Sequence, residues 1–286
     1  MQFGLSEEQI LLQDNVNRFL DDNSPLDRVR NYADGGEDSD IWAGLAELGI
    51  PALLIPEAQG GIGLQPMDAA IVAECLGSHI APTPFLGSAV MAPTALVASG
   101  GDHGELLAEI AAGTTRVGIA FGEAIKRRND AGVTVKDGRM SGTSMYAFDA
   151  QADVYLVADQ HQHIYLVRAD DPGLKRSNLV TVDKTRRTVE LNYDNVAAAT
   201  ISTEASVFAT TVDIGRVALA ADTLGAAQNM LDQAVEYAKQ REQFNRPIGS
   251  FQAVKHMCAE MAAELEPCRS MVWFAGHALA ELPEEA

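Results

Sequence analysis

Hydrophobic residues recur every three or four positions through the N-terminal part of the chain, a period that predicts amphipathic helices. Ser6 and Gln9 have the spacing of a capping box, so a helix is expected to begin directly after Ser6. Two further apolar stripes lie at 41–48, which is followed by Gly49, and at 67–78. This part of the chain is therefore expected to form an all-helical domain.

The loop PEAQGGIGLQP, between the second and third stripes, resembles a dinucleotide-binding turn at first sight. Gly61 and Gly63 supply the first two glycines of the G-x-G-x-x-G pattern, but the third falls on Pro66. No alternation of strands and helices surrounds the loop, as that fold requires. We therefore expect a tight backbone turn between helices and no nucleotide site.

From Arg116 onward the hydrophobic period changes to two, which predicts β-strands. Short runs rich in Val, Ile, Tyr and Thr follow, with the sequences RVGIAF, GVTVKDGRMSG, DVYLVAD, HIYLVRA and TVELNYDNV. Asp137 and Gly138 form a dipeptide typical of a two-residue hairpin turn. The pattern predicts a small antiparallel β domain.

After Thr203 the helical period returns in two long stretches, 217–238 and 254–278, which are joined by a corner at 241–249. Two helices with a short link pack antiparallel, but a pair alone seldom buries both apolar faces, whereas a four-helix bundle does. We expect a C-terminal long-helix bundle that is incomplete here, because the sequence stops at ELPEEA.

The order of these elements predicts a multi-domain α+β protein. The expected bounds are 1–115 for the N-terminal all-α domain, 116–204 for the middle β domain and 205–286 for the partial helical bundle.

Composition and charge narrow the classes of partner. The 286 residues are 47% hydrophobic, and 21 Lys and Arg against 40 Asp and Glu give a formal charge of −19. Such a charge repels phosphate backbones and anionic lipid, so nucleic acid and membrane are not expected as main partners. No apolar run reaches the length of about 20 residues that a membrane span needs, and the first residues lack a signal-peptide pattern. We expect a cytoplasmic protein.

Cysteine and histidine spacing gives no support for a disulfide framework or a metal site. The chain has three cysteines, an odd number with no paired spacing, and we expect them to be buried thiols. They are Cys75, Cys258 and Cys268. His161 and His163 lie two positions apart with no third ligand suggested, so they are expected to be surface or core histidines. We therefore expect no bound metal ion.

Three stretches of the chain carry a resemblance to a known family. The longest is VDIGRVALAADTLGAAQNMLDQAVEYAKQREQFNRPIGSFQAVKHMCAEM, and the other two are LSEEQ and LAELGIPALLIPEAQGGIGL. In these stretches the sequence resembles the acyl-CoA dehydrogenases, FAD-dependent flavoproteins that remove hydrogens from the α and β carbons of acyl-CoA thioesters. The resemblance covers nearly the whole chain, and it implies that the C-terminal part of the family's last helical domain is missing from this sequence.

The resemblance implies a cofactor role for the corner. In the family, an Arg-x-x-Phe corner reaches the flavin of a neighbouring subunit, which assigns Arg241, Phe244 and Gln252 to FAD. A guanidinium pairs well with pyrophosphate, and an aromatic face packs on a planar ring. The alternative is a polar helix connection in which Arg241 pairs with Glu242 or Glu236.

The same resemblance places Asp213 and Arg216 near the acyl-CoA, on the first turn of the long helix. Asp213 could equally stabilise the positive end of the helix dipole, and the residues alone leave both roles open.

The middle domain departs from the family pattern in two places. Where the family has a Thr-Glu-Pro-x-x-Gly-Ser-Asp loop that binds flavin and substrate, this chain has AFGEAIKRRND, which keeps Glu123 and replaces the Gly-Ser pair. The replacing residues are Arg127, Arg128 and Asn129. The family's Trp-Ile-Thr at the isoalloxazine edge corresponds here to Met145-Tyr146-Ala147. Met145 can still pack on the flavin ring, but Ala147 cannot donate the threonine's hydrogen bond.

No catalytic base is visible. Abstraction of the α proton needs a positioned carboxylate, and the resemblance offers two places for it. One lies beyond the last residue of this sequence, and the other is occupied by Gly215. The catalytic residues are therefore left unassigned.

Two main functions follow from the resemblance. The first is an FAD-dependent acyl-CoA dehydrogenase of fatty acid or steroid catabolism, in a homo- or hetero-oligomer with flavin sites at subunit interfaces and an external electron acceptor. The second is a non-catalytic partner subunit that lends Arg241 and Phe244 to a neighbour's flavin. An oxidase or monooxygenase on the same scaffold is a third possibility. The acyl group and the acceptor are left open.

Overall fold

The computed structural model describes residues 4–36, 39–125 and 131–282. The positions replacing the family's Gly-Ser pair, Arg127, Arg128 and Asn129, lie outside the described residues. The chain forms two compact units, each built from separate segments of sequence. The first contains Met1–Leu26, Pro66–Ala81 and Val217–Ala286, and the second contains Asp27–Gln65 and Pro82–Arg216.

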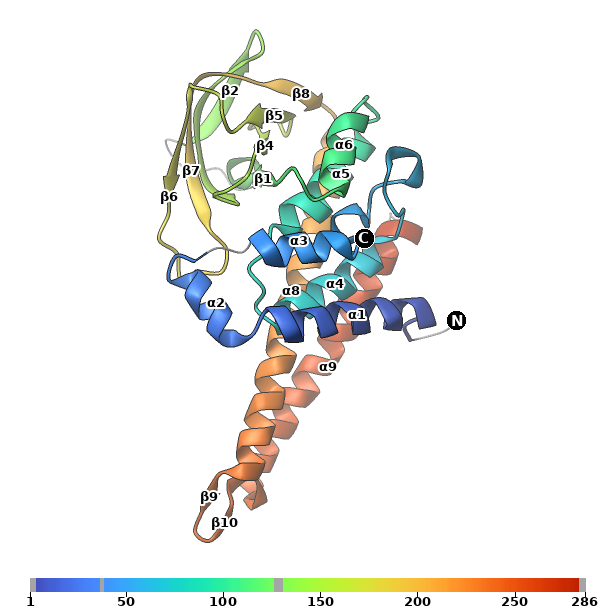
Figure 1. Ribbon diagram of the computed structural model, residues 1–286, viewed down its shortest axis with the longest axis vertical. Coiled ribbons are helices and arrows are strands. Elements are labelled where there is room, and N and C mark those ends of the chain that lie inside the picture. Colours follow the sequence, from blue (N-terminus) through green and yellow to red (C-terminus); the bar gives the residue numbers. More distant parts are fainter. Residues whose placement is uncertain (1–3, 37–38, 126–130, 283–286) are drawn as a thin grey trace. The chain divides into compact units, whose positions relative to one another are not determined.

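The first unit is built from helices (Figure 1). They are α1 (Glu7–Asn23), α4 (Pro66–Ser78), the part of α8 (Ala205–Gln240) that follows residue 216, and α9 (Gln252–Glu281). The predicted capping box is present at the start of α1, where the Ser6 side chain accepts from the Gln9 backbone N–H and the Gln9 side chain accepts from the Ser6 N–H. The N-terminal cap was therefore predicted correctly.

Two glycines bring α4 and α8 into close contact. A Cβ atom on Gly77 would overlap the carbonyl of Asp222, and a Cβ on Gly225 would overlap the carbonyl of Glu74. Both glycines lie inside helices, where glycine normally costs about 1 kcal/mol relative to alanine. The close backbone approach is what requires them.

The two long helices run antiparallel, as predicted, and are joined at their ends by a small hairpin (Figure 1). Gln228 of α8 accepts a hydrogen bond from Arg269 of α9, while Gly249, just before α9, packs against the carbonyl of Ala238. The hairpin consists of β9 (Glu242–Gln243) and β10 (Arg246–Pro247), followed by the 3-10 turn η4 (Ile248–Ser250). The predicted corner is thus a two-stranded tip.

The second unit combines short helices with a sheet. Its helical segments are α2 (Leu26–Ala33), α3 (Ser39–Glu47), η1 (Ile50–Ala52), η2 (Glu57–Gln59), the π-helical η3 (Leu86–Met91), α5 (Ala92–Ala98), α6 (Gly104–Ala111), α7 (Gly122–Ile125) and the start of α8. Gly61 lies so close to Ile55 that a Cβ atom would overlap the Ile55 carbonyl. The PEAQGGIGLQP loop is therefore the tight turn that the sequence predicts.

An eight-stranded sheet occupies the second unit, with strand order β6-β7-β3-β1-β4-β5-β8 and β2 paired to β3 (Figure 1). The strands are β1 (Val117–Ala120), β2 (Gly132–Lys136), β3 (Arg139–Phe148), β4 (Val154–Ala158), β5 (Ile164–Arg168), β6 (Leu174–Asn178), β7 (Thr188–Ala197) and β8 (Ala199–Ser202). Asp137 and Gly138 both have positive φ, 50° and 71°, and form the predicted hairpin turn between β2 and β3.

The sheet corrects one feature of the prediction. All strand pairs are antiparallel except β1 with β4, which are parallel, so the domain is mixed. The chain between β1 and β4 contains the β2–β3 hairpin, and β3 takes the antiparallel position on the other side of β1.

Alternate residues of the central strands enter two hydrophobic cores, one on each face of the sheet. Val117 and Ile119 of β1 belong to the core that also contains residues of α5, α6 and the start of α8. Ala120 of β1 and Ala147 of β3 belong to the other core. This period of two is what made the strands recognisable in the sequence.

The described part of the chain contains no helix long and apolar enough to cross a membrane. Cys75 is buried, as predicted, whereas Cys258 and Cys268 are partly exposed. Their exposure corrects the expectation of three buried thiols.

Candidate functional site

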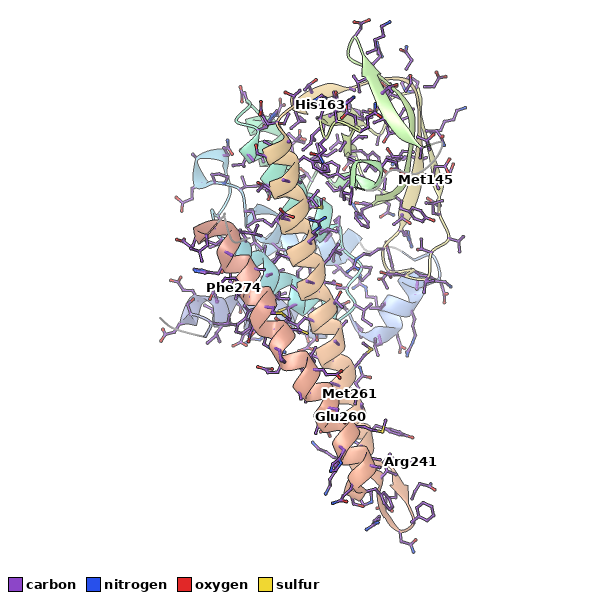
Figure 2. The ribbon with its side chains drawn as sticks, turned by 180° about the vertical axis from the view of Figure 1, so that it is seen from behind. Met145, His163, Arg241, Glu260, Met261 and Phe274 are labelled. Atoms are coloured by element: carbon purple, nitrogen blue, oxygen red, sulfur yellow. The ribbon has the colours of Figure 1, made fainter. Side chains whose placement is uncertain are left out.

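The corner between α8 and α9 carries three of the predicted cofactor residues. Arg241, Phe244 and Gln252 are all exposed, and Figure 2 shows Arg241 beside the hairpin tip. The Arg241 backbone closes the corner, because its N–H donates to the Tyr237 carbonyl and its carbonyl accepts from the Ile248 N–H, both at 2.8 Å. The side chains therefore project from a fixed backbone.

The hairpin tip holds an aromatic residue in an unfavourable backbone conformation. Phe244 and Asn245 have φ of 53° and 60°, and the Phe244 side chain is 85% exposed. A left-handed conformation costs a bulky residue about 1–2 kcal/mol, and an exposed ring recovers little by burial. Strained residues of this kind cluster at ligand-binding positions.

A second aromatic ring and a second arginine lie near the hairpin tip. The Phe251 ring lies edge-on to Phe244 with ring centroids 6.0 Å apart, and the Arg246 guanidinium lies 4.0 Å from the Phe251 centroid. Among the described residues, no ion pair joins Arg241 to either glutamate of the alternative interpretation, and Glu236 pairs with Lys239. The guanidinium of Arg241 is thus not committed to a carboxylate of the described chain.

Met145 lies on β3 in a β-bulge. From Ser144 to Ala147, β3 advances by three residues while its partner strand β7 advances by two. The extra residue forms the bulge, in which Tyr146 has a φ of 55°. The Met145 N–H donates to the Glu123 carboxylate at 3.3 Å. The bulge leaves Met145 partly exposed (Figure 2).

Ala147 lies in a different environment from Met145. It is fully buried in the hydrophobic core on one face of the sheet, so none of its surface is open to a cofactor. Of these two residues, only Met145 is therefore open to a cofactor.

Asp213 and Arg216 lie within α8 and form an ion pair with each other at 2.8 Å. The helix begins at Ala205, two turns before Asp213, so neither residue is on its first turn. The expected first-turn position and the helix-dipole role for Asp213 are both wrong. The β-branched residues before Asp213 concealed the true start of the helix.

Gly215 lies against the side chain of Met91. A Cβ atom on Gly215 would lie 2.9 Å from the Met91 sulfur and 3.2 Å from its Cγ. A side chain at this position would require the flexible thioether end of Met91, which is buried in the π-helical segment η3, to shift. The structure therefore agrees with the sequence in offering no base here.

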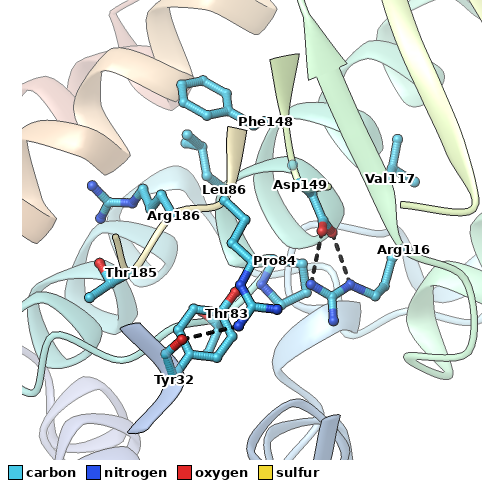
Figure 3. A pocket seen from close by; sticks show the side chains of 12 residues that line it. Tyr32, Thr83, Pro84, Leu86, Arg116, Val117, Phe148, Asp149, Thr185 and Arg186 are labelled. Atoms are coloured by element: carbon cyan, nitrogen blue, oxygen red, sulfur yellow. Dashed lines mark hydrogen bonds and ion pairs between the residues drawn. The ribbon is translucent and has the colours of Figure 1, made fainter. Parts of the chain in front are cut away.

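A small pocket of about 40 Å³ in the second unit is rich in arginine (Figure 3). Arg116 pairs with Asp149 at 2.9 Å through two hydrogen bonds. Arg187 lies 4.1 Å from the centroid of the Tyr32 ring and donates to the Tyr32 carbonyl at 3.0 Å. These contacts hold loops together, and the sequence could not reveal them because their partners are far apart in the chain.

A wider depression of about 1030 Å³ in the same unit has an acidic lining. Its carboxylates are Glu105, Glu109, Asp153, Asp170 and Asp171. Arg168 also lines it and pairs with Asp170 at 3.0 Å, which lowers the pKa of Asp170. This concentration of negative charge disfavours the phosphates of coenzyme A and FAD.

No group of three or more His, Cys, Asp and Glu side chains that could hold a metal ion occurs within residues 4–36, 39–125 and 131–282. His163 lies 3.2 Å from Asp159, a buried carboxylate that also accepts from the Tyr165 hydroxyl. These side chains form a hydrogen-bonded cluster at the turn between β4 and β5.

Two family models match the chain, one before the strands of the sheet in sequence and one after them. The model "Acyl-CoA dehydrogenase, N-terminal domain" matches residues 6–114, and "Acyl-CoA dehydrogenase, C-terminal domain" matches residues 205–285. Together they cover more than half of the sequence. The chain belongs to the acyl-CoA dehydrogenase family. The resemblance seen in the sequence is therefore confirmed.

Individual acyl-CoA dehydrogenases give the same result. Acyl-CoA dehydrogenase IpdE2 of Mycobacterium tuberculosis is 32% identical over 252 residues, which span 88% of this chain and 69% of that protein. The ChsE4-ChsE5 complex from Mycobacterium tuberculosis has a chain 25% identical with a TM-score of 0.88, covering 99% of this chain and 80% of that one. The Tcur3481-Tcur3483 steroid ACAD is 29% identical with a TM-score of 0.86, covering 96% and 79%.

Proposed function

We propose that this chain is a subunit of an FAD-dependent acyl-CoA dehydrogenase, which catalyses α,β-dehydrogenation of an acyl-CoA thioester. Family membership supports the reaction class. The observation that carries the cofactor assignment is the exposed, left-handed Phe244 beside Arg241 at the hairpin tip. An aromatic face and a guanidinium suit the adenine and pyrophosphate of FAD.

Two parts of the chain would hold flavin. Arg241, Phe244 and Gln252 would bind the FAD of a neighbouring subunit, and Met145 would pack against the flavin of its own subunit. The donor set fits FAD, since it combines a cation, an aromatic face and an amide. Bound FAD supplies the acceptor for the hydride that leaves the β carbon of the thioester.

The ion pair of Asp213 with Arg216 would contact the acyl-CoA substrate. Both side chains are at least partly exposed, so the pair is available to a polar ligand. Abstraction of the α proton requires a positioned carboxylate, and Gly215, packed against Met91, offers none. The base is accordingly left unassigned.

An apolar surface on α9 supports an oligomer. Its exposed residues share one side of the helix, at successive spacings of four, ten and three positions, and Figure 2 labels two of them. They are Met257, Met261, Met271 and Phe274. Exposed apolar surface of this kind typically marks a protein interface, so we infer that the flavin sites lie between subunits.

A second candidate is a non-catalytic partner subunit of a heteromeric acyl-CoA dehydrogenase. The contact of Gly215 with Met91 and the burial of Ala147 favour it, because both remove groups that would act on substrate or flavin. The names ChsE4-ChsE5 and Tcur3481-Tcur3483 each join two proteins, and the second is a steroid ACAD. We infer a two-chain assembly acting on a steroid or fatty acyl-CoA, with an external electron acceptor and a cytoplasmic location.

The proposal is tested by isolating residues 1–286 alone and together with each dehydrogenase-like chain encoded beside its gene. Each preparation is saturated with FAD and given short, medium, long and steroid acyl-CoAs, with reduction of an artificial acceptor as the readout. We expect turnover only in the two-chain assembly, because Gly215 offers no carboxylate to abstract the α proton. Full turnover by the single chain would contradict the partner-subunit interpretation. No flavin binding in any preparation would contradict both candidates.

A further inference from the structure

β6 is an edge strand whose outer side has no partner in the described part of the chain. It ends the strand order of the sheet and pairs with β7 alone (Figure 1). The Leu179 N–H, one residue after β6, donates to the Thr188 carbonyl of β7 at 3.0 Å. Because bonding directions alternate along an antiparallel ladder, the N–H and C=O groups of Arg176 and Asn178 point away from β7. Such an open row can pair with a further strand.

Two exposed valines follow β6. The relative exposures of Val180 and Val182 are 99% and 104%, so neither side chain is covered by the described chain. Their loop is held by hydrogen bonds of its own, since the Asp183 carboxylate accepts from the backbone N–H and the hydroxyl of Thr185 at 2.8 and 2.6 Å. The open edge therefore continues into exposed apolar surface, which is typical of protein interfaces.

The edge is basic, although the chain as a whole is acidic. Residues 174–187 contain five basic residues and one acidic residue, whereas the whole chain has 21 basic and 40 acidic residues. Lys175 and Lys184 are exposed, and no ion pair joins either of them to a described residue. The other basic residues of the segment are Arg176, Arg186 and Arg187. A basic surface on so acidic a molecule favours an anionic partner at this edge.

Charged side chains on an edge strand ordinarily prevent pairing between copies of the same protein. A second copy of this chain would bring its own Lys175 and Arg176 to the same edge, and like charges opposite each other destabilise a strand pair. A strand that carries carboxylates meets no such repulsion, because opposite charges across a strand pair attract. The charge of the edge therefore favours an acidic strand over a second copy.

Side-chain alternation fixes the pattern expected of the partner. Lys175 and Arg176 lie on opposite faces of the sheet, because successive side chains of a strand alternate. The Arg176 guanidinium donates to the carbonyls of Ala150 and Ala152 at 3.3 and 3.2 Å, which leaves Lys175 as the basic residue of β6 that is open to a partner. The same alternation places Val180 on the Arg176 face. A matching strand would carry carboxylates on the Lys175 face and apolar side chains on the other.

We propose that β6, together with the loop 179–187, is a docking edge for a different protein chain. The partner adds an extended segment of alternating acidic and apolar residues to the sheet as a further strand, and backbone hydrogen bonds to Arg176 and Asn178 hold it. None of the residues assigned above to flavin or substrate lies in 174–187, so docking at this edge does not depend on the proposed function.

The decisive variant is Asn178→Pro. Proline has no N–H, and the N–H of Asn178 points outward, so the substitution removes a donor to the partner and no bond to β7. Ser177 already has the extended conformation that a following proline favours. Asn178→Ala is the matched control, because it removes the same side chain and keeps the N–H.

A second pair of variants tests the charge. Lys175→Glu replaces the open basic residue of β6 by an acidic one and should repel an acidic strand. Lys136→Glu makes the same change of charge on β2 of the same sheet, where Lys136 is also exposed. We expect Lys136→Glu to bind the partner as the wild type does.

The probe is a fluorescent peptide of about ten residues, the length of a long strand, in which Glu alternates with Val. Its fluorescence anisotropy is followed while full-length protein is added, in the assembly in which the wild type is isolated. Asn178→Pro should raise the Kd about tenfold, as for a hydrogen bond lost with its partner left unsatisfied. Asn178→Ala should leave the Kd unchanged, and both variants should keep the thermal midpoint of the wild type. Lys175→Glu should also weaken binding.

Two further peptides keep the test independent of folding. The same peptide with N-methyl groups at alternate residues cannot donate to the edge, and a peptide with Lys in place of Glu has the wrong charge; neither should bind the wild type. Equal Kd values for the wild type and Asn178→Pro, or for the methylated and unmethylated peptides, would overturn the proposed strand pairing. A wild type that does not bind the acidic peptide would also overturn it. Self-association of the wild type that Asn178→Pro abolishes would make a second copy the occupant and overturn the acidic partner.

Discussion

Arg269 of α9 forms an ion pair with Glu74 of α4, although the two residues are 195 positions apart in the chain. The pair is largely buried, with side-chain exposures of 19% and 9%. The Trp273 indole N–H donates to the other oxygen of Glu74 at 3.3 Å, and Arg269 also donates to Gln228 at 2.9 Å. The Arg269 side chain therefore connects three helices of the first unit, α4, α8 and α9.

Removing one member of this pair should be strongly destabilising. Arg269→Met leaves the Glu74 carboxylate buried without its cation, and such changes cost about 3–5 kcal/mol. Urea unfolding followed by circular dichroism measures the loss. The double substitution Arg269→Met with Glu74→Leu should recover most of it, because no buried charge remains. A single variant as stable as the wild type would show that the pair contributes little.

Local signals explain which features the sequence predicted. The capping box of Ser6 with Gln9 and the hairpin turn at Asp137-Gly138 depend only on neighbouring residues, and both are present. The hydrophobic period also depends on neighbours, so the order of helices and strands is correct.

Non-local pairings explain what the sequence did not predict. The parallel pairing of β1 with β4 joins segments separated by a hairpin, and no local pattern encodes it. The bond between Arg269 and Glu74 and the packing of Met91 against Gly215 depend on tertiary contacts in the same way. At the candidate site, the sequence and the family resemblance named Arg241 and Phe244, but the left-handed backbone of Phe244 was visible only in the structure.

Gly225→Ala should destabilise the first unit, although the same change stabilises an ordinary helix by about 1 kcal/mol. The added methyl group would overlap the Glu74 carbonyl and force α4 away from α8. We expect a net loss of about 1–3 kcal/mol, as for other overpacked sites, measured by urea unfolding. Gly104→Ala is the control, because its Cβ would approach only the Asp102 side chain, at 3.8 Å. Stabilisation by Gly225→Ala would contradict the close helix contact.

Cys75 should be the least reactive of the three thiols. Burial, with a smaller contribution from the nearby Glu74, raises the pKa of the Cys75 thiol from 9.0 to about 12. A raised pKa means less of the reactive thiolate at any given pH, so alkylation of Cys75 should stay slow until the pH approaches 12. Mass spectrometry after timed iodoacetamide treatment at pH 8 should find Cys258 and Cys268 labelled first. Equal labelling of all three in the folded protein would contradict the burial of Cys75.

Arg241→Ala should lower the FAD content of the assembled oligomer while leaving its helical content nearly unchanged. The guanidinium is exposed and pairs with no carboxylate of the described residues, so its loss should alter folding by less than about 0.5 kcal/mol. The readout is flavin absorbance per assembled oligomer. Lys239→Ala removes a cation from the last turn of α8 that is already paired with Glu236, and it serves as the control. Unchanged flavin content in Arg241→Ala would remove Arg241 from the cofactor site.

Phe244→Gly separates the effect of the strained hairpin tip on stability from its effect on FAD binding. Glycine adopts a φ of 53° without steric cost, whereas a left-handed phenylalanine costs about 1–2 kcal/mol. Since the ring is 85% exposed, its removal sacrifices little burial, and glycine's greater freedom in the unfolded chain offsets only part of the gain. We therefore expect the thermal midpoint to stay the same or rise, while FAD content falls with the loss of the aromatic face. Asn245→Gly is the control, because it relieves the neighbouring left-handed residue, with φ of 60°, and keeps the ring. If Phe244→Gly retains full FAD content, the ring has no role in binding the cofactor. If it unfolds the corner, the ring serves the fold and not the ligand.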